Sequence, residues 1–97
     1  MFVLFLSPAA EQDISEVAVW YDHQRKGLGA DFLLSVEAEL SSILRNPFHY
    51  SEQRLGFRRG ILKRFPYAIF YRMEKQQIIA VAVFHFSRKP WAWRKRK

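Results

Sequence analysis

The stretch RRGILKRFPYAIFY, residues 58–71, joins a basic segment to an aromatic and apolar one. After Pro66, alternate residues point to opposite faces of an extended chain, with Tyr67, Ile69 and Tyr71 on one face and Ala68, Phe70 and Arg72 on the other. Aromatic and β-branched residues favour a pleated, largely buried strand, and proline is tolerated at the first position of a strand. The stretch therefore predicts a buried strand with a basic surface beside it.

Two further strands are predicted around this one. Residues 56–63 form the first strand, 67–74 the second and 77–86 the third, with Lys75-Gln76 at the tip of the hairpin between the last two. The third strand is apolar on both faces, which predicts a central position in the sheet. The carboxy-terminal half therefore predicts a three-stranded antiparallel meander.

The amino-terminal segment predicts a strand followed by a helix. Residues 2–6 are a short continuous apolar run, typical of a strand buried on both sides. The run is too short to span a membrane and lacks the basic region of a signal peptide. Ser7 then fits a helix N-cap, and Pro8 fits the first helical position, where its missing N–H costs no hydrogen bond.

Two apolar stripes at spacings of three and four predict two amphipathic helices. The first stripe comprises Ala10, Ile14, Val17 and Tyr21, and the second Leu28, Phe32, Leu33, Val36, Leu40, Ile43 and Leu44. Gly27 and Gly29 separate the helices, and Asn46-Pro47 ends the second because proline cannot continue a helix. So short a break predicts an antiparallel helical hairpin. The predicted fold class is α+β, in the order β-α-α-β-β-β, with both helices packed on one face of the sheet.

The net charge differs sharply between the two halves of the chain. Residues 1–45 carry seven acidic and three basic side chains, a net charge of −4, whereas residues 46–97 carry thirteen basic and two acidic side chains, a net charge of +11. Positive charge of this density attracts nucleic acid or an acidic protein segment, or it forms a solvated, solubilising surface. The polar faces of the helices are acidic, which argues against a membrane partner.

A length of 97 residues predicts one domain with one core, in which residues 88–97 form a basic, flexible tail. The chain has no cysteine, which excludes disulfides and thiolate metal sites and fits a cytoplasmic protein. The three histidines, His23, His49 and His85, are scattered and do not form a metal-binding motif. We expect no metal and no cofactor.

An ordered set of residues runs through nearly the whole chain: Ser7, Ala10, Trp20, Tyr21, Gly27, Leu28, Gly29, Phe32, Asn46, Pro47, Arg58 or Arg59, Arg64, Phe65, Pro66, Tyr67, Ile69, Tyr71, His85, Arg88, Pro90 and Trp93. Together with the predicted element order, this set resembles the RelE/ParE superfamily of type II toxin–antitoxin toxins. The resemblance implies a small α+β fold with a helical hairpin packed on an antiparallel sheet. It also implies a cognate acidic antitoxin whose partly disordered segment wraps the toxin.

Two activities occur in this superfamily. RelE-like members cut mRNA in the ribosomal A site, whereas ParE-like members poison DNA gyrase. The chain carries Trp91 and Trp93 near its end but no tyrosine of the kind in the typical RelE set, which favours the gyrase activity. The dense cationic surface expected on the sheet favours mRNA cleavage. We expect a growth-inhibiting toxin that targets gyrase, with ribosome-dependent mRNA cleavage as the alternative and an inactive, antitoxin-binding member as a further one.

Cleavage of RNA without a metal requires proton-transfer groups and fixed cations around one phosphate. The candidate catalytic residues are Arg59, Lys63, His85 and Arg88. Strand alternation predicts that Arg59 and Lys63 share one face of residues 56–63. It places Arg58 and Arg64 on the other face. His85 lies in an apolar run, so a structural role is its alternative.

Binding of the antitoxin or of nucleic acid has separate candidates. These are Arg58, Arg64, Trp91, Trp93 and Arg94. In one interpretation the tryptophans of the tail stack on unpaired bases while its cations contact phosphates, and in the other they cover the edge of the sheet. Tyr67 and Tyr71 share a face with Ile69, so both are expected to pack in the core with their hydroxyls satisfied at its edge.

Overall fold

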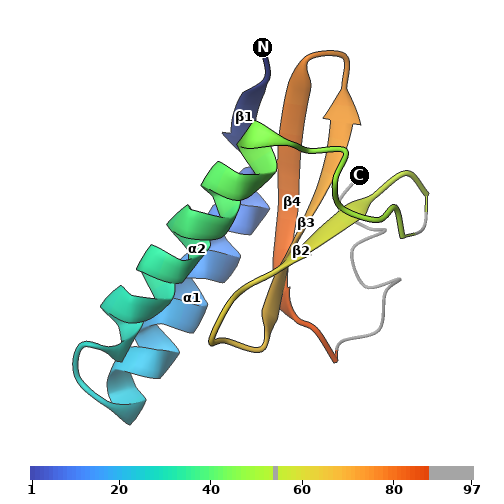
Figure 1. The fold of residues 1–97 in the computed structure, drawn as a ribbon. Helices are drawn as coiled ribbons and strands as arrows, with labels where there is room; N and C mark the ends of the chain where they lie inside the picture. Colours follow the sequence, from blue (N-terminus) through green and yellow to red (C-terminus); the bar gives the residue numbers. More distant parts are fainter. Residues whose placement is uncertain (54, 88–97) are drawn as a thin grey trace.

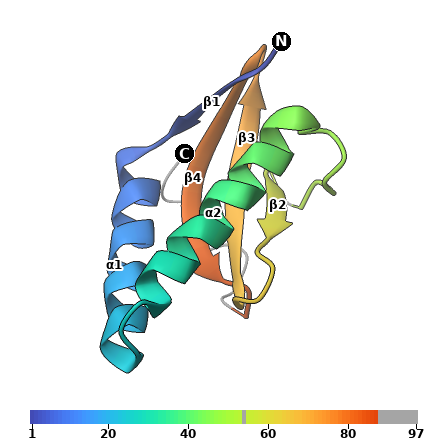
Figure 2. The ribbon, with the colours of Figure 1, turned by 60° about the vertical axis from the view of Figure 1, so that its left-hand side comes forward.

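The computed structural model describes residues 1–53 and 55–87 (Figure 1). Its elements are β1 (Val3–Leu6), α1 (Pro8–Gln24), α2 (Leu28–Arg45), β2 (Arg58–Ile61), β3 (Tyr67–Glu74) and β4 (Gln77–His85). The strands form one sheet in the order β1-β4-β3-β2, in which β1 runs parallel to β4 and the other pairs are antiparallel. Both helices pack on the same face of the sheet (Figure 2). The predicted α+β class and element order are confirmed, and the sheet is mixed because β1 joins it in parallel.

β1 is an edge strand, which corrects the prediction that residues 2–6 are buried on both sides. Leu4 and Leu6 pack against the core between the sheet and the helices. Val3 and Phe5 point to the opposite face and are half-exposed. The apolar run alone does not distinguish an edge strand from a central one, because the segments that pack on each face of the strand are distant in the sequence. β4 lies between β1 and β3, which confirms its predicted central position.

α1 begins as predicted, with Ser7 as the N-cap and Pro8 at the first helical position. The Ser7 hydroxyl accepts a hydrogen bond from the Ala10 backbone N–H at 3.1 Å, which satisfies one of the unpaired donors of the first turn. The predicted stripe faces the core: Ala10 and Ile14 are buried, and Val17 and Tyr21 are partly buried against the same cluster.

The start of α2 is capped by a carboxylate from the end of α1. Gly27 precedes the helix with a φ of 92°, a left-handed conformation that glycine adopts without steric cost. The Asp22 carboxylate accepts hydrogen bonds from the backbone N–H groups of Gly27 at 2.9 Å and Gly29 at 3.2 Å. Asp22 therefore both closes the helical hairpin and satisfies donors at the N-terminus of α2.

Asp22→Ala is expected to lower the free energy of unfolding by about 1–2 kcal/mol, because two backbone N–H groups lose their acceptor. Asp22→Asn keeps a side-chain oxygen in the same place, so we expect it to lower the free energy of unfolding by only a small fraction of the loss caused by Asp22→Ala. Urea denaturation followed by far-ultraviolet circular dichroism measures both. Equal losses would show that the charge of Asp22, and not its capping oxygen, stabilises the hairpin.

α2 turns a narrower apolar stripe to the core than its sequence predicts. The buried apolar residues are Phe32, Val36 and Ile43. Leu33 and Leu44 are exposed, because each follows a buried residue by one position and is rotated from the stripe by ~100°. Glu39, unlike Leu33 and Leu44, lies on the buried face of α2. Within the described part of the chain, no helix is both long and apolar enough to cross a membrane.

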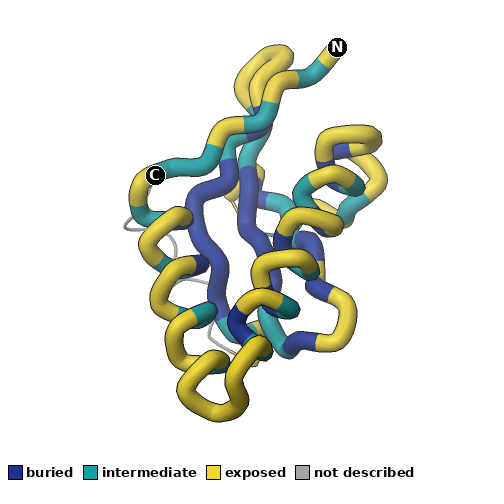
Figure 3. The backbone as a smooth tube through the Cα atoms, turned by 90° about the vertical axis from the view of Figure 1, so that its left-hand side faces the viewer, coloured by how far each residue is buried: buried dark blue, intermediate teal, exposed yellow. Residues whose placement is uncertain are grey.

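The sheet separates two apolar clusters. The cluster between the sheet and the helices includes Phe32, Val36, Ile43, Leu62, Phe65, Ile69, Tyr71, Ile78 and Val83. The second contains Phe57, Ala68, Phe70, Val81, Ala82 and Phe84 on the opposite face. The middle of β3 and β4 is buried throughout (Figure 3). A register shift between Phe70 and Tyr71 interrupts the alternation of β4, so that Val81 and Ala82 both join the second cluster. The predicted faces of β3 are confirmed.

Candidate functional site

β2 is shorter than predicted, so the cations after it lie in a turn. The strand ends two residues before Lys63, and residues 62–66 lead into β3 without strand pairing. Arg64 has a φ of 73°, in the left-handed region that interrupts an extended chain. The prediction that Lys63 shares a strand face with Arg59 is therefore wrong, and so is the matching prediction for Arg58 and Arg64. Strand alternation no longer applies once the extended conformation ends.

Arg58 contacts the loop that precedes β2. Its guanidinium donates a hydrogen bond to the Tyr50 backbone carbonyl, lies 3.8 Å from a Glu52 carboxylate oxygen and sits 5.2 Å from the Phe48 ring centroid. In the β2–β3 register it pairs with Tyr71, so it points to the helix side of the sheet. Its side chain is only 19% exposed. Through these contacts, Arg58 holds the loop that precedes β2 against the sheet.

Arg59 and His85 lie on opposite faces of the sheet. Arg59 pairs in register with Phe70, a member of the second cluster. His85 pairs with Tyr67, and the centroids of their two rings are 5.4 Å apart on the helix side. Side chains of directly paired residues point to the same face. The sheet therefore separates two of the candidate catalytic side chains.

His85 ends β4 with one ring nitrogen engaged. The Ser87 backbone N–H donates to its Nδ1 at 3.1 Å, and the Ser87 hydroxyl lies 2.7 Å from the same atom. Because Nδ1 accepts a hydrogen bond, the neutral ring carries its hydrogen on Nε2. The ring borders a small groove that is also lined by Asp13 and Glu16 of α1. His85 therefore lies between α1 and the end of β4, on the face of the sheet opposite to Arg59.

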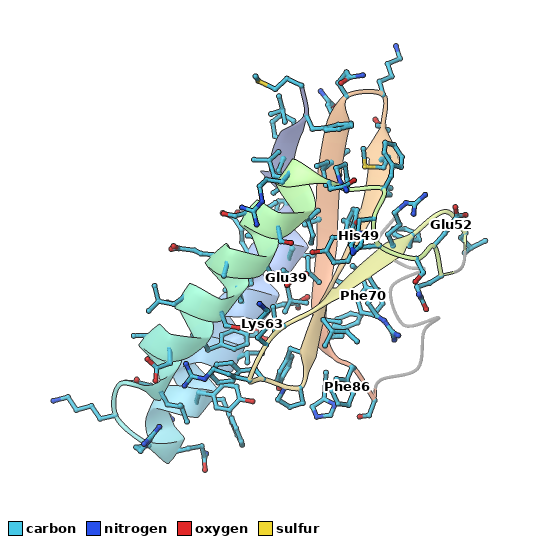
Figure 4. All side chains as sticks on the ribbon, in the orientation of Figure 1. Glu39, His49, Glu52, Lys63, Phe70 and Phe86 are labelled. Atoms are coloured by element: carbon cyan, nitrogen blue, oxygen red, sulfur yellow. The ribbon has the colours of Figure 1, made fainter. Side chains whose placement is uncertain are left out.

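A groove of about 410 Å³ separates α2 from the turn after β2. We call it the α2 groove, and its lining includes Ser35, Ala38, Glu39 and Ser42 of α2 and Lys63 and Arg64 of the turn. The Ser35 hydroxyl donates to the Lys63 carbonyl at 2.8 Å, and the Arg64 guanidinium lies 3.9 Å from the Asp31 carboxylate. These two contacts hold the turn against α2. Figure 4 shows Glu39 and Lys63 in the space between α2 and β2.

Glu39 is the most buried of the residues that line the α2 groove, with an exposed fraction of 9%. Its carboxylate lies against β2: a Cβ at Gly60 would stand 2.7 Å from Glu39 Oε2, so the glycine leaves room for the acid. Sequence reasoning that counted Glu39 only among the charges of a helix missed this residue. The available signal was its position three residues after Val36 and four before Ile43, on the core-facing stripe.

Tyr67 and Tyr71 pack in the core as predicted. Tyr71 is fully buried, and its hydroxyl donates to the Pro47 backbone carbonyl at 2.6 Å. Burial raises the pKa of Tyr71 well above its usual value, although the nearby Arg58 opposes this shift. The hydroxyl therefore stays protonated and serves as a structural donor. Tyr67 is partly buried against the same cluster.

The remaining predicted residues, Arg88, Trp91, Trp93 and Arg94, lie outside the described residues. Their roles in catalysis or in binding stay predictions, and so do both interpretations of the tail. Among residues 1–53 and 55–87, no three histidine, aspartate or glutamate side chains are grouped as a metal site requires. The described candidates thus occupy four separate places: Arg58 against the loop before β2, Arg59 on the second face, His85 beside α1, and Lys63 with Arg64 in the α2 groove.

Comparison with known proteins agrees with this fold. A family model described as "ParE toxin of type II toxin-antitoxin system, parDE" matches residues 4–90. A solved structure described as "Chromosomal ParDE TA system from P. aeruginosa" is similar with a TM-score of 0.79 at 13% sequence identity, over 88% of this chain and 96% of that chain. No curated protein matches the sequence. The structural similarity concerns the fold, whereas the family match covers most of the sequence. The chain belongs to the ParE family of type II toxin–antitoxin toxins, within the RelE/ParE superfamily.

Proposed function

We propose that this toxin inhibits growth by binding DNA gyrase and that a cognate acidic antitoxin neutralises it by direct binding. The family to which the chain belongs supports a toxin role. The similar structure from P. aeruginosa is described as a ParDE toxin–antitoxin system, which supports the pairing with an antitoxin here. The choice between gyrase and mRNA as the target depends on the candidate catalytic side chains.

The distribution of these side chains carries the proposal. An RNA-cleaving site needs its acid, its base and its cations within hydrogen-bond distance of one phosphate. Arg59 and His85 are separated by the sheet, and Lys63 lies in the turn against α2. In the described part of the chain these three groups do not converge, which supports action by binding a large target rather than by cutting RNA.

The charge of the chain supports the antitoxin pairing. The formal net charge is +7, and the excess of bases lies in residues 46–97. An acidic segment is attracted to such a surface over a range set by the ionic strength, and it orders when it binds. A disordered acidic antitoxin segment therefore has both an electrostatic driving force and a complementary surface.

The decisive experiment is a supercoiling assay with purified gyrase and relaxed plasmid, to which the toxin is added in increasing amounts. We expect loss of supercoiled product and accumulation of cleaved plasmid as the toxin approaches the gyrase concentration. Because a basic chain also binds DNA without specificity, relaxation by topoisomerase I serves as the matched control and is expected to continue unchanged. Inhibition of both enzymes alike would reveal DNA coating and count against the proposal.

A reconstituted translation reaction tests the alternative target. Primer extension on the mRNA is expected to find no new ends, with or without ribosomes. Cuts that require ribosomes would overturn gyrase binding in favour of cleavage by Arg59, Lys63, His85 and Arg88, and Arg59→Ala with Arg88→Ala would then abolish the cuts. If neither gyrase nor mRNA is affected, the chain keeps only antitoxin binding.

A further inference from the structure

β1 leaves one edge of the sheet open to a further strand. Because β1 is the outermost strand, β4 pairs with only one of its two sides. The backbone N–H groups of Val3 and Ser7 donate to carbonyl oxygens on the β4 side, at 3.0 Å and 2.9 Å. Neighbouring residues of a strand direct their backbone groups to opposite sides, so those of Phe2, Leu4 and Leu6 point outward. Within the described part of the chain, no strand pairs with this outer side.

The two edges of the sheet differ in their protection. An open edge pairs with other chains unless charges, proline or a covering segment prevent it. At the β2 edge, Arg58 and Arg59 lie on the strand, and Glu52 of the preceding loop forms a β-bridge with Arg58. β1 contains no charged residue, proline or glycine, and its Val3 and Phe5 side chains are half-exposed. β1 is therefore the edge that suits strand addition.

The outward groups of β1 match those of a second copy that runs antiparallel to it. Opposite residues in an antiparallel pair share a face, and alternate pairs exchange two hydrogen bonds each. When Leu4 lies opposite Leu4 of the second copy, Phe2 lies opposite Leu6, and each of these pairs joins outward-directed groups. The intervening pairs place Val3 opposite Phe5, an aromatic and β-branched combination that stabilises sheets. Strand β1 is thus complementary to itself.

The two ends of β1 carry opposite charges. The Gln76 carbonyl accepts a hydrogen bond from the start of β1, so the tip of the β3–β4 hairpin, with the exposed Lys75, lies beside that end (Figure 1). α1 begins directly after β1, and Glu11 is exposed in its first turn. Glu74 at the tip pairs with Arg72, whereas Lys75 and Glu11 form no salt bridge within residues 1–53 and 55–87. An antiparallel copy brings Lys75 of each chain towards Glu11 of the other.

We propose that the toxin self-associates through β1, which pairs antiparallel with β1 of a second copy about a twofold axis at Leu4. The two sheets then form one continuous sheet, with both helical hairpins on the same face. β1 has only four residues, so the interface is smaller than the ~1,200 Å² typical of stable complexes. We therefore expect a transient dimer with a Kd on the order of 100 μM.

Sedimentation velocity of the full chain, from ~10 μM to ~1 mM at physiological salt, tests the dimer. The weight-average sedimentation coefficient is expected to rise with concentration. Val3→Lys combined with Phe5→Lys places lysines opposite one another and is expected to weaken association at least ~10-fold, whereas Leu34→Lys, at an exposed position of α2, leaves it unchanged. A monomer at every concentration would leave the edge to a strand of another protein and overturn the proposal.

A charge exchange at exposed positions tests the register without disturbing the core. Lys75→Glu and Glu11→Lys each place like charges together and are expected to weaken association by about 3–10-fold, whereas the two combined restore it. Glu37→Lys, exposed on α2, is the control for a changed net charge and is expected to have little effect.

Net charge alone predicts a different result. Lys75→Glu would then strengthen association, because it lowers the positive charge of both copies, and Glu11→Lys would weaken it. That result, or a combined variant as weak as the single ones, would reject the β1 dimer. These measurements use the toxin alone, so they do not depend on the outcome of the supercoiling assay.

Discussion

Phe32→Ala is expected to lower the free energy of unfolding by about 3–5 kcal/mol, the largest loss among the substitutions considered. Phe32 is fully buried at the centre of an aromatic group between the helical hairpin and the sheet. Its ring centroid lies 5.5 Å from that of Tyr21, 5.4 Å from that of Phe65 and 5.6 Å from that of Tyr67. Truncation removes the buried ring and leaves a cavity that these neighbours fill only in part.

The size of this loss matters because a domain of this length is stabilised by only about 5–15 kcal/mol. Urea denaturation, followed by circular dichroism at constant protein concentration, measures the change in the midpoint. Leu34→Ala provides the control on the same helix, because Leu34 is 62% exposed, and its expected effect is within about 0.5 kcal/mol. Similar losses in the two variants would contradict the observed orientation of α2.

Gly29→Ala is expected to destabilise the domain by about 1–3 kcal/mol, even though alanine favours helix more than glycine does. A Cβ at Gly29 would stand 2.4 Å from the Ala18 carbonyl oxygen and 3.2 Å from Asp22 Cβ. The first contact involves backbone, so α1 and α2 must separate to relieve it. The separation also disturbs the Asp22 carboxylate that caps α2. Overpacking therefore outweighs the gain of roughly 1 kcal/mol in helix propensity.

The control for Gly29→Ala is Ala30→Gly, at an exposed position one residue further along α2. It measures the propensity difference without a clash and is expected to cost about 1 kcal/mol. Thermal unfolding at fixed pH and salt compares the two variants. If Gly29→Ala raised the Tm, the close crossing of the helices would be excluded.

Local sequence patterns predict most of the secondary structure. β3 is predicted at its observed bounds, Tyr67–Glu74, because proline precedes it and a polar turn follows it. The helices are predicted with similar accuracy, since Ser7 caps α1 and Asn46-Pro47 ends α2. Capping, proline geometry and alternation act within a few residues, so they are readable without knowledge of the fold.

The candidate site is less predictable. Alternation places Arg59 and Lys63 together only while the chain stays extended, and β2 ends before Lys63. The prediction for Leu33 and Leu44 fails for a related reason, because the width of a buried stripe depends on the surface that covers the helix. The depth of Glu39 likewise depends on the missing side chain at Gly60, which is distant in sequence.

The order of the elements, the helical hairpin, the exclusion of cysteine chemistry and the concentration of positive charge in residues 46–97 follow from the amino-acid sequence alone. Three further features depend on how the elements pack: β1 lies at the edge, the sheet separates Arg59 from His85, and Glu39 lies buried in the α2 groove. The two sets differ in how far apart in the sequence the interacting residues are. Propensity and capping depend on neighbouring residues, and net charge depends on composition alone. Burial, facing and pairing arise from contacts between segments far apart in the chain.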